Sequence, residues 1–277
     1  MRLIVKTLID NKPNPDNPKL KGAHGLSLLL DLTYDKENVK ILFDAGPSPD
    51  VLKANSEKLD VDLRDIKMIV ISHGHYDHAD GIPAALSSTK PIIIHPNAFT
   101  LKVRSKPYIR FIGMRYNKRQ LRDMGGIVLP LREKMEISRG IYISGEVKGD
   151  RRVDPDLCIV DDKGGLSIDP MIDEQYLLAR INNKNIMIVG CSHPGIDIMA
   201  MHCLQLFGIK RIDAIIGGLH TAWSDPDYIE EIALKLKELG VEQLYPGHCT
   251  GDKGIKILKN VYGGKCEGLY VGFELSF

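Results

Sequence analysis

The chain has 277 residues, enough for one large domain or two small ones with a substantial core. Its apolar content of 43% and charged content of 26% are typical of a soluble globular protein, and a net charge of +1 gives no general reason to expect nucleic acid or an anionic membrane as a partner. No apolar stretch approaches a membrane span in length, and we expect no secretory signal. Five cysteines without a C-x-x-C pair favour a reducing compartment, so we expect a cytoplasmic protein.

The first 66 residues predict three strands and one helix. Residues 2–10 are expected to form a strand, and the apolar runs 26–32 and 39–43 flank a polar turn, which is typical of a hairpin. Ser48 is suited to cap a helix that extends to about residue 59. Asp44, directly after the hairpin, is either a turn residue or a support for a nearby site.

Residues 73–78, which read His-Gly-His-Tyr-Asp-His, follow directly after the apolar strand 67–72. His73 and His75 are two positions apart, so both rings can point the same way at the end of a strand. Asp77 and His78 are expected in a loop, close enough to serve a second metal ion. Imidazole and carboxylate groups are ligands of Zn²⁺ and related cations, and so dense a cluster favours a metal site over an incidental polar loop.

Eight cations interleaved with aromatic residues occupy the segment from about residue 100 to 124. They are Lys102, Arg104, Lys106, Arg110, Arg115, Lys118, Arg119 and Arg122. Such a stripe can bind nucleic acid, form a solvated face, or pair arginines with a substrate phosphate. We expect a solvated face for most of these residues, and a phosphate contact for one or two of Arg104, Arg110, Arg115 and Arg119.

The rest of the chain predicts short strands and helices, with residues 127–129, 135–137 and 141–144 opening a second sheet. Cys191 and His193 follow a buried strand that ends in glycine, and His220 and His248 follow two later strands. Further strands are expected at 91–95, 158–160, 175–180, 186–189, 211–216, 244–248 and 269–277, and helices at 81–87, 198–207, 225–239 and 251–259.

The pattern H-x-H-x-D-H at residues 73–78 resembles the signature of the metallo-β-lactamase superfamily. Residues 42–46 (Leu-Phe-Asp-Ala-Gly) and 246–248 (Pro-Gly-His) resemble its first and last motifs. One branch is more similar still, the proteins resembling the 7,8-dihydropterin-6-methyl-4-(β-D-ribofuranosyl)aminobenzene-5'-phosphate synthase. Its motifs are matched at 23–27, 72–78, 190–195, 217–220 and 248–251.

The resemblance implies an α/β (α+β) fold, a four-layer αββα sandwich of two mixed sheets flanked by helices, with the site along the edge between the sheets. We treat residues 1–277 as a single domain with a basic insertion at about 100–124. The implied metal residues are His73, His75, Asp77, His78, Cys191, His193 and His248.

The chain departs from the superfamily at Cys191, where the usual residue is an aspartate that bridges two metals. The usual middle histidine has no candidate except His95, which we interpret as a structural residue, so we infer that His193 acts as a ligand instead. Cys191 is either a thiolate ligand or a buried, packed thiol.

Other candidate residues follow from the same resemblance. His24 is either a solvated loop residue or a substrate-binding residue at the pocket mouth. Asp77 and His220 are the candidates for acid–base catalysis. Asp173 and Glu174 are either surface-turn residues or an acid pair belonging to the site.

The implied activity is that of a metal-dependent hydrolase that uses a metal-activated water or hydroxide. We expect one or two divalent ions per chain, with zinc first and manganese or iron as alternatives, and a phosphorylated, pterin-related small molecule as substrate. An iron-binding redox or sensor protein and a non-catalytic metal-binding protein of the same fold are the alternatives. We expect no nucleic acid or membrane partner, and the oligomeric state stays open.

Overall fold

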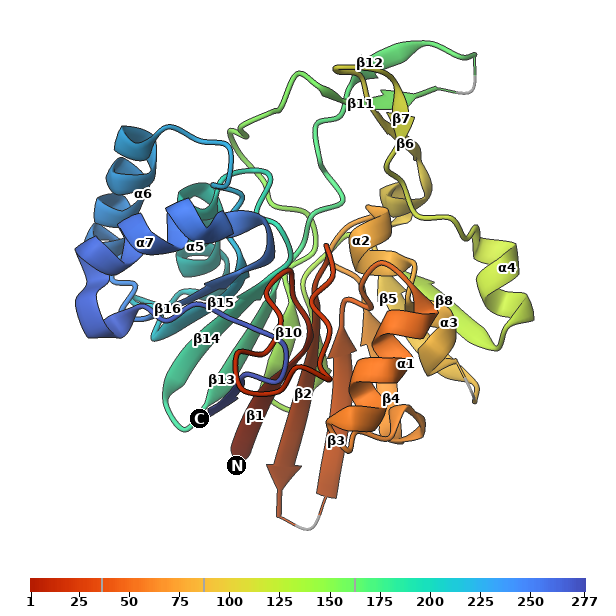
Figure 1. Cartoon of the computed structure of the whole chain (residues 1–277), viewed down its shortest axis with the longest axis horizontal. Helices are drawn as coiled ribbons and strands as arrows, with labels where there is room; N and C mark the ends of the chain where they lie inside the picture. The colour runs from red at the N-terminus through yellow and green to blue at the C-terminus, as the bar shows by residue number, and fades with distance from the viewer. Residues whose placement is uncertain (36, 87, 162) are drawn as a thin grey trace.

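Two large β-sheets pack face to face in the computed structural model, which describes residues 1–35, 37–86, 88–161 and 163–277 (Figure 1). The first sheet has, in spatial order, β17 (Glu274–Ser276), β1 (Arg2–Ile9), β2 (Ser27–Tyr34), β3 (Glu37–Phe43), β4 (Ile66–Val70), β5 (Lys90–Ile94) and β8 (Gly126–Pro130). Strands β1, β2 and β3 are antiparallel neighbours, whereas β3, β4, β5 and β8 run parallel. The predicted hairpin is therefore confirmed as β2 and β3.

The second sheet supplies the other half of the sandwich. Its spatial order is β16 (Leu244–Gly247), β15 (Ala214–Gly218), β14 (Lys184–Val189), β13 (Leu177–Ile181), β10 (Ile141–Ile143) and β9 (Met135–Ser138). Strands β14, β15 and β16 are parallel, and the others are antiparallel to their neighbours. Both sheets are thus mixed, as expected.

Alternating side chains of the strands divide the core into three apolar layers. Leu28 and Leu30 of β2 point between the sheets and meet Ile186 and Ile188 of β14, whereas Leu29 points to the outer face. Fully burying each such side chain contributes roughly 1.5–3 kcal/mol. The inner layer therefore holds the two sheets together.

Helices cover both outer faces of the sandwich (Figure 1). The first sheet is covered by α1 (Pro49–Lys58) and α3 (Ile82–Ala85), and the second by α5 (Ile196–Phe207), α6 (Pro226–Glu238) and α7 (Gly251–Tyr262). Helix α1 begins where Ser48 accepts a hydrogen bond from the Val51 N–H, and α5 ends at Gly208 in the left-handed conformation. The predicted four-layer αββα arrangement is confirmed.

A third, four-stranded antiparallel sheet stands at the top of the view in Figure 1. It consists of β12 (Leu166–Ile168), β11 (Leu157–Val160), β6 (Leu101–Arg104) and β7 (Arg110–Phe111). The basic insertion thus contributes two strands to this small sheet, followed by α4 (Lys118–Asp123). We call this four-stranded unit the small sheet.

Two local expectations are wrong, and one sheet was not expected. Residues 127–129 lie in β8 of the first sheet and not in the second, because β8 pairs with β5. Residues 158–160 form a strand as predicted, but it belongs to the small sheet, which the sequence did not predict. Asp77 and His78 lie in the short helix α2 (Tyr76–Ala79) and not in a loop. Among the described residues, no helix combines the length and the apolar character that a membrane crossing requires.

Candidate metal centre

The carboxyl ends of the parallel strands of both sheets lie at one edge of the sandwich. Asp44 follows β3, the segment His73–His78 follows β4, and Cys191 follows β14 by one residue. His220 and His248 follow β15 and β16. Because parallel strands end at the same edge, residues far apart in the sequence meet there, as the strand-end pattern predicted.

The backbone at these strand ends adopts a conformation that is rare for residues other than glycine. Positive φ angles occur at Asp44 (57°), Ser192 (63°), His220 (52°) and His248 (48°). The left-handed region costs roughly 1–2 kcal/mol per residue of this kind, so the surrounding structure must hold each of these turns in place. Strain of this kind clusters at functional sites.

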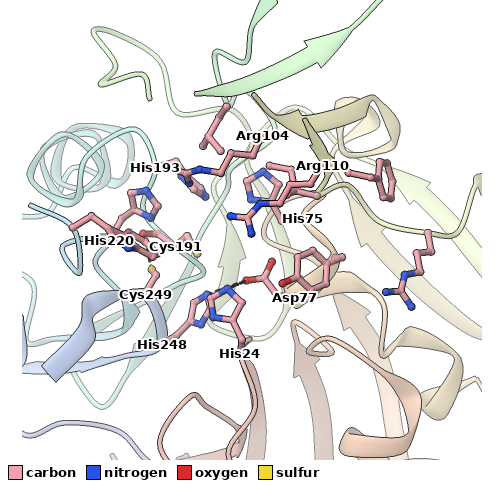
Figure 2. A pocket seen from close by; sticks show the side chains of 16 residues that line it. His24, His75, Asp77, Arg104, Arg110, Cys191, His193, His220, His248 and Cys249 are labelled. Carbon is pink, nitrogen blue, oxygen red and sulfur yellow. Dashed lines mark hydrogen bonds and ion pairs between the residues drawn. The ribbon is translucent and has the colours of Figure 1, made fainter. Parts of the chain in front are cut away.

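Potential ligand atoms gather in two separate sets at this edge, and the atoms of each set lie within 4.8 Å of one another. The first set is His73, His75 and His193, and the second is His24, Asp77 and His248. Cys191 connects them, because it forms further sets with His73 and His78, with His193 and His220, and with His248 and Cys249. Figure 2 shows Cys191 between His193 and His248. We call the first set the upper donors and the second the lower donors.

Asp44 fixes the proton positions of two histidines. Its Oδ2 accepts from His78 Nδ1 at 2.6 Å and from Ser72 Oγ at 2.8 Å. Since the Ser72 proton goes to Asp44, Ser72 Oγ accepts from His73 Nδ1 at 2.9 Å. In its neutral form each ring therefore presents an unprotonated Nε2 to the centre, which is the orientation that a metal ligand requires. Gly190 is needed beside them, because an added Cβ would lie 2.2 Å from Ser72 Oγ.

Asn11 determines which ring nitrogen carries the proton in two of the lower donors, His248 and His24. The Gly25 N–H donates to Asn11 Oδ1 at 3.1 Å, which identifies the amide oxygen. His248 Nδ1 donates to the same oxygen at 2.9 Å, so its Nε2 is free of a proton and available to a metal. Asn11 Nδ2 lies 3.3 Å from His24 Nδ1, so neutral His24 carries its proton on Nε2, 3.3 Å from Asp77 Oδ2. His24 therefore supports Asp77.

Two buried carboxylates support the loops that carry the ligands. Glu174 accepts the backbone N–H groups of Cys191, Ser192 and His193 at 2.7–3.0 Å. Asp173 accepts the N–H of Gly74 at 2.8 Å. The surface-turn interpretation of these two acids is wrong, because both are buried.

The ammonium group of Lys102 neutralises the negative charge of Asp173. Its Nζ lies 2.9 Å from Asp173 Oδ1 and also pairs with Asp169, and its side chain is buried. Lys102 is thus an exception to the solvated face expected for the basic segment. Opposite charges outweigh burial here and raise the pKa of the Lys102 ammonium group.

The upper donors are electrostatically suited to stay neutral. Burial lowers the pKa of His75 to about 3 and brings the pKa values of His73 and His193 well below the ordinary value. Neutral imidazole is the form that binds metal. His78 differs, because the charges of Asp44 and Asp77 outweigh burial and raise its pKa to about 9. The carboxylates around His78 thus favour a positive charge at this point.

The donor atoms fit a divalent metal ion. His75 Nε2 and His193 Nε2 are buried and have no hydrogen-bond partner among the described residues, which is unfavourable unless another group binds them. His78 Nε2 and His248 Nε2 lie 3.2 Å apart, and the proton of each ring is on the opposite nitrogen. When both rings are neutral, two lone pairs face each other at this distance, which is unfavourable unless a proton or a metal ion binds there. Imidazole, thiol and carboxylate groups match the ligand preferences of zinc.

A cavity of 320 Å³ opens directly over these donors. Its lining includes His24, His75, Asp77, Cys191, His193, His220, His248 and Cys249, together with Arg104, Arg110 and Arg115. Figure 2 shows Arg104 and Arg110 reaching over the histidines from the small-sheet side. Arg104 lies 3.7 Å from Asp154 and Arg115 lies 3.1 Å from Asp80, whereas Arg110 forms no ion pair with any described residue.

Two candidates lie outside this cavity. Arg119 is on α4, where its exposed side chain pairs with Asp123 at 3.8 Å. His95 bonds to Glu146 at 3.0 Å and accepts from the Asn97 N–H, which agrees with a structural role. Asn11 was not predicted as a site residue, since an amide in a proline-rich loop carries no metal-binding signal. Trp223, an exposed aromatic residue at the cavity, was not predicted either.

Comparisons with known proteins agree with this architecture. The family model of the Metallo-beta-lactamase superfamily matches residues 24–193. The 7,8-dihydropterin-6-methyl-4-(beta-D-ribofuranosyl)-aminobenzene-5'-phosphate synthase of Methanocaldococcus jannaschii is 29% identical, over 99% of this chain and 96% of its own. An uncharacterised protein of the same organism is 30% identical, over 96% of this chain and 100% of its own.

A solved structure is similar over nearly the whole length. It is described as a metal-dependent hydrolase of the beta-lactamase superfamily, and it matches with a TM-score of 0.84 and 31% identity. The match covers 99% of this chain and 98% of the other. The family model, the whole-length relatives and the shared fold lead to one assignment: the chain belongs to the metallo-β-lactamase superfamily.

Proposed function

We propose that this protein is a cytoplasmic, zinc-dependent hydrolase that cleaves a phosphoester bond in a small, pterin-related molecule. The observation that carries the proposal is the two sets of donors facing one cavity of 320 Å³ that three arginines also line. The pterin relation is supported by the name of the synthase from M. jannaschii, which includes both a dihydropterin and a phosphate.

In this proposal, His73, His75 and His193 hold one ion, and Asp77, His78 and His248 hold a second, with Cys191 between them. A divalent ion bound here would lower the pKa of a coordinated water from about 15.7 towards about 7 and would polarise a phosphoryl oxygen. The chain offers no G-x-S-x-G elbow as a competing nucleophile. Water is therefore the expected attacking group.

The arginines of the cavity bind and orient the phosphoryl group. A guanidinium matches the geometry of phosphate oxygens and keeps its charge at neutral pH. Arg110 is best placed for this role, because no described carboxylate neutralises it. Arg104 and Arg115 add positive charge on either side.

Asp77 and His220 complete the proposed chemistry. Asp77 Oδ2 lies 3.3 Å from the protonated His24 Nε2, so this ring holds the carboxylate in place, and it lies 3.4 Å from His248 Nε2. His220 Nδ1 is buried at the cavity without a partner among the described residues. We propose that His220 Nδ1 donates a proton to the leaving oxygen when the phosphorus–oxygen bond breaks.

The first test removes and restores the metal. Chelator-treated protein should lose hydrolysis of a panel of phosphodiesters, lactones and phosphorylated pterins, and zinc should restore it for the phosphorylated members. His75→Ala and His248→Ala should each weaken metal binding by at least about a hundredfold, since even residues behind the ligands cost roughly 10–100-fold. His202→Ala is the control, because His202 bonds to Tyr176 away from the centre. Undiminished metal content in both ligand variants would contradict the proposal.

A matched pair of arginine variants tests the phosphate contact. Arg110→Ala should raise the KM for phosphorylated substrates roughly ten- to a hundredfold, the effect of losing a charged hydrogen bond of about 1.5–3 kcal/mol, and should leave metal content unchanged. Arg119→Ala removes the same charge from the same insertion, outside the cavity, and should change neither. Equal binding of phosphorylated and dephosphorylated ligands would exclude the contact.

A further inference from the structure

A second cavity of 220 Å³ adjoins the first across His193 and His220. The two cavities also share Arg104, Leu157 and Trp223, so they lie side by side along these residues. The metal donors therefore lie at one end of an extended cleft, and the second cavity forms its other end.

The two ends differ in charge. The first cavity has Arg110, which no described carboxylate neutralises. Two cations line the second cavity, and both already have a carboxylate partner: Arg104 lies 3.7 Å from Asp154. Arg152 is paired with the buried Asp197 and lies 5.3 Å over the ring of Tyr228. An anionic group is therefore favoured in the first cavity. Among its described residues, the second cavity offers no unneutralised positive charge that would attract one.

The lining of the second cavity is suited to an apolar, flat group. It includes Leu157, Ile196, Leu219, Tyr228 and Ile232, and its rim carries Trp223. Trp223 is 68% exposed, which is unusual for so large an apolar side chain, and its ring centre lies 5.7 Å from that of His220. An exposed indole at the border of two cavities offers a face on which a planar ring can stack.

We propose that the second cavity is an aromatic-ring subsite, in which Trp223 stacks on the planar part of a substrate whose phosphoryl group occupies the first cavity. This inference rests on the proposed function and adds to it the place in which the planar ring of the substrate binds. It also fixes the orientation of that substrate, with the anion at the metal donors and the ring towards α6.

The sequence provides a reporter for this subsite, because Trp223 is the only tryptophan in the chain. Metal-loaded protein can be titrated with methylphosphonate, benzylphosphonate and cyclohexylmethylphosphonate, whose carbon–phosphorus bond is not a phosphoester. Benzylphosphonate should change the tryptophan fluorescence, and methylphosphonate should not. Calorimetry should show benzylphosphonate binding about five- to a hundredfold more tightly than methylphosphonate, the range expected for one stacked ring.

Variants decide whether Trp223 is responsible. Trp223→Ala should remove the preference for benzylphosphonate, and Trp223→Phe should keep most of it, both measured by calorimetry. Tyr108→Ala is the matched control, since Tyr108 is 67% exposed and lines neither cavity, and it should change nothing. An unchanged benzyl preference in Trp223→Ala would overturn the subsite. Equally tight binding of the cyclohexyl ligand would overturn its specificity for a planar ring.

Hydrolysis assays separate this inference from the proposed function. If the unmodified protein hydrolyses phosphoesters but shows no preference for benzylphosphonate, the subsite alone would be refuted. A benzyl preference that depends on Trp223, in a protein that hydrolyses no phosphoester, would refute the proposed activity and leave the subsite standing. Failure of all three phosphonates to bind would count against both.

Discussion

Cys191 lies at the position where the two donor sets meet. Its Sγ lies 3.1 Å from His78 Nε2, and burial raises the pKa of its thiol well above the ordinary value in the absence of a cation. A bound metal reverses that preference, because a coordinating thiol is deprotonated. Cys191 is therefore the residue through which the choice of metal can be tested.

If Cys191 is a ligand, Cys191→Ser should weaken zinc binding much more than manganese binding, because thiolate favours the softer zinc ion. Competition with a chromogenic chelator for each metal measures both affinities. Metal should also protect Cys191 from alkylation. Cys203→Ser is the control, since Cys203 is buried in α5 away from the donors. An unchanged ratio of zinc to manganese affinity would assign Cys191 to packing alone.

The ligand-type residues could be predicted from the sequence, but their supports could not. His73 to His78 form a local motif, and His193, His220 and His248 each follow a recognisable strand. The role of Asn11 depends on a contact with a residue 237 positions away, which no local pattern contains. Glu174 is equally hidden, because a carboxylate before a strand looks the same whether it is solvated or bonded to three backbone N–H groups.

Among the elements, α5 depends on one buried carboxylate in its first turn. Asp197 pairs with Arg152, and its Oδ2 lies 2.9 Å from Lys235 Nζ of α6. These partners outweigh burial and lower the pKa of Asp197 from 3.8 to about 2. A lowered pKa means that the charged form stabilises the fold, by about 2 kcal/mol for a shift of this size.

Asp197→Asn should therefore lower the free energy of unfolding by about 2 kcal/mol at pH 7. The difference from the unmodified protein should persist above pH 4 and shrink as the pH falls from about 4 to about 2, because Asp197 then becomes protonated and neutral. Urea titrations across this range measure it. The exposed Asp227 provides the control, since Asp227→Asn should change stability by less than about 0.5 kcal/mol. A difference that does not vary with pH would rule out the ion pair as its source.

Element types were more predictable than element partners. Residues 127–129 and 158–160 were both predicted as strands, but pairing is decided by contacts with distant strands. Residues 127–129 were therefore placed in the wrong sheet, and the small sheet that contains 158–160 was not predicted. Asp77 and His78 were expected in a loop because a four-residue helix is too short to show a period. The hairpin and the helix capped by Ser48 were predictable because their signals are local.

For the whole molecule, we propose that residues 1–277 form one domain. The two large sheets share a single apolar layer, in which Leu30 and Phe43 of the first sheet belong to the same cluster as Ile188 and Ile216 of the second. Without the other sheet, each sheet would expose the apolar side chains of its inner face to water. The expected result is one cooperative unfolding transition.

Urea unfolding in excess chelator should give coincident curves for Trp223 fluorescence and for far-ultraviolet circular dichroism. Fluorescence reports on the loop between β15 and α6, whereas dichroism reports on all helices and strands. Two separated midpoints would show that part of the chain, with the small sheet as the first candidate, unfolds as a separate unit.

The lower donors draw on both ends of the chain. Asp10 accepts the N–H of His248 at 2.8 Å across 238 positions, and β1 pairs with β17 so that the termini lie near each other (Figure 1). At a translation rate of roughly 5–20 residues per second, His248 is synthesised roughly ten to fifty seconds after Asp10. During this interval the ribosome carries a chain whose histidines and thiols have no completed site to occupy. The complete centre can therefore be filled only after almost the whole chain has been synthesised.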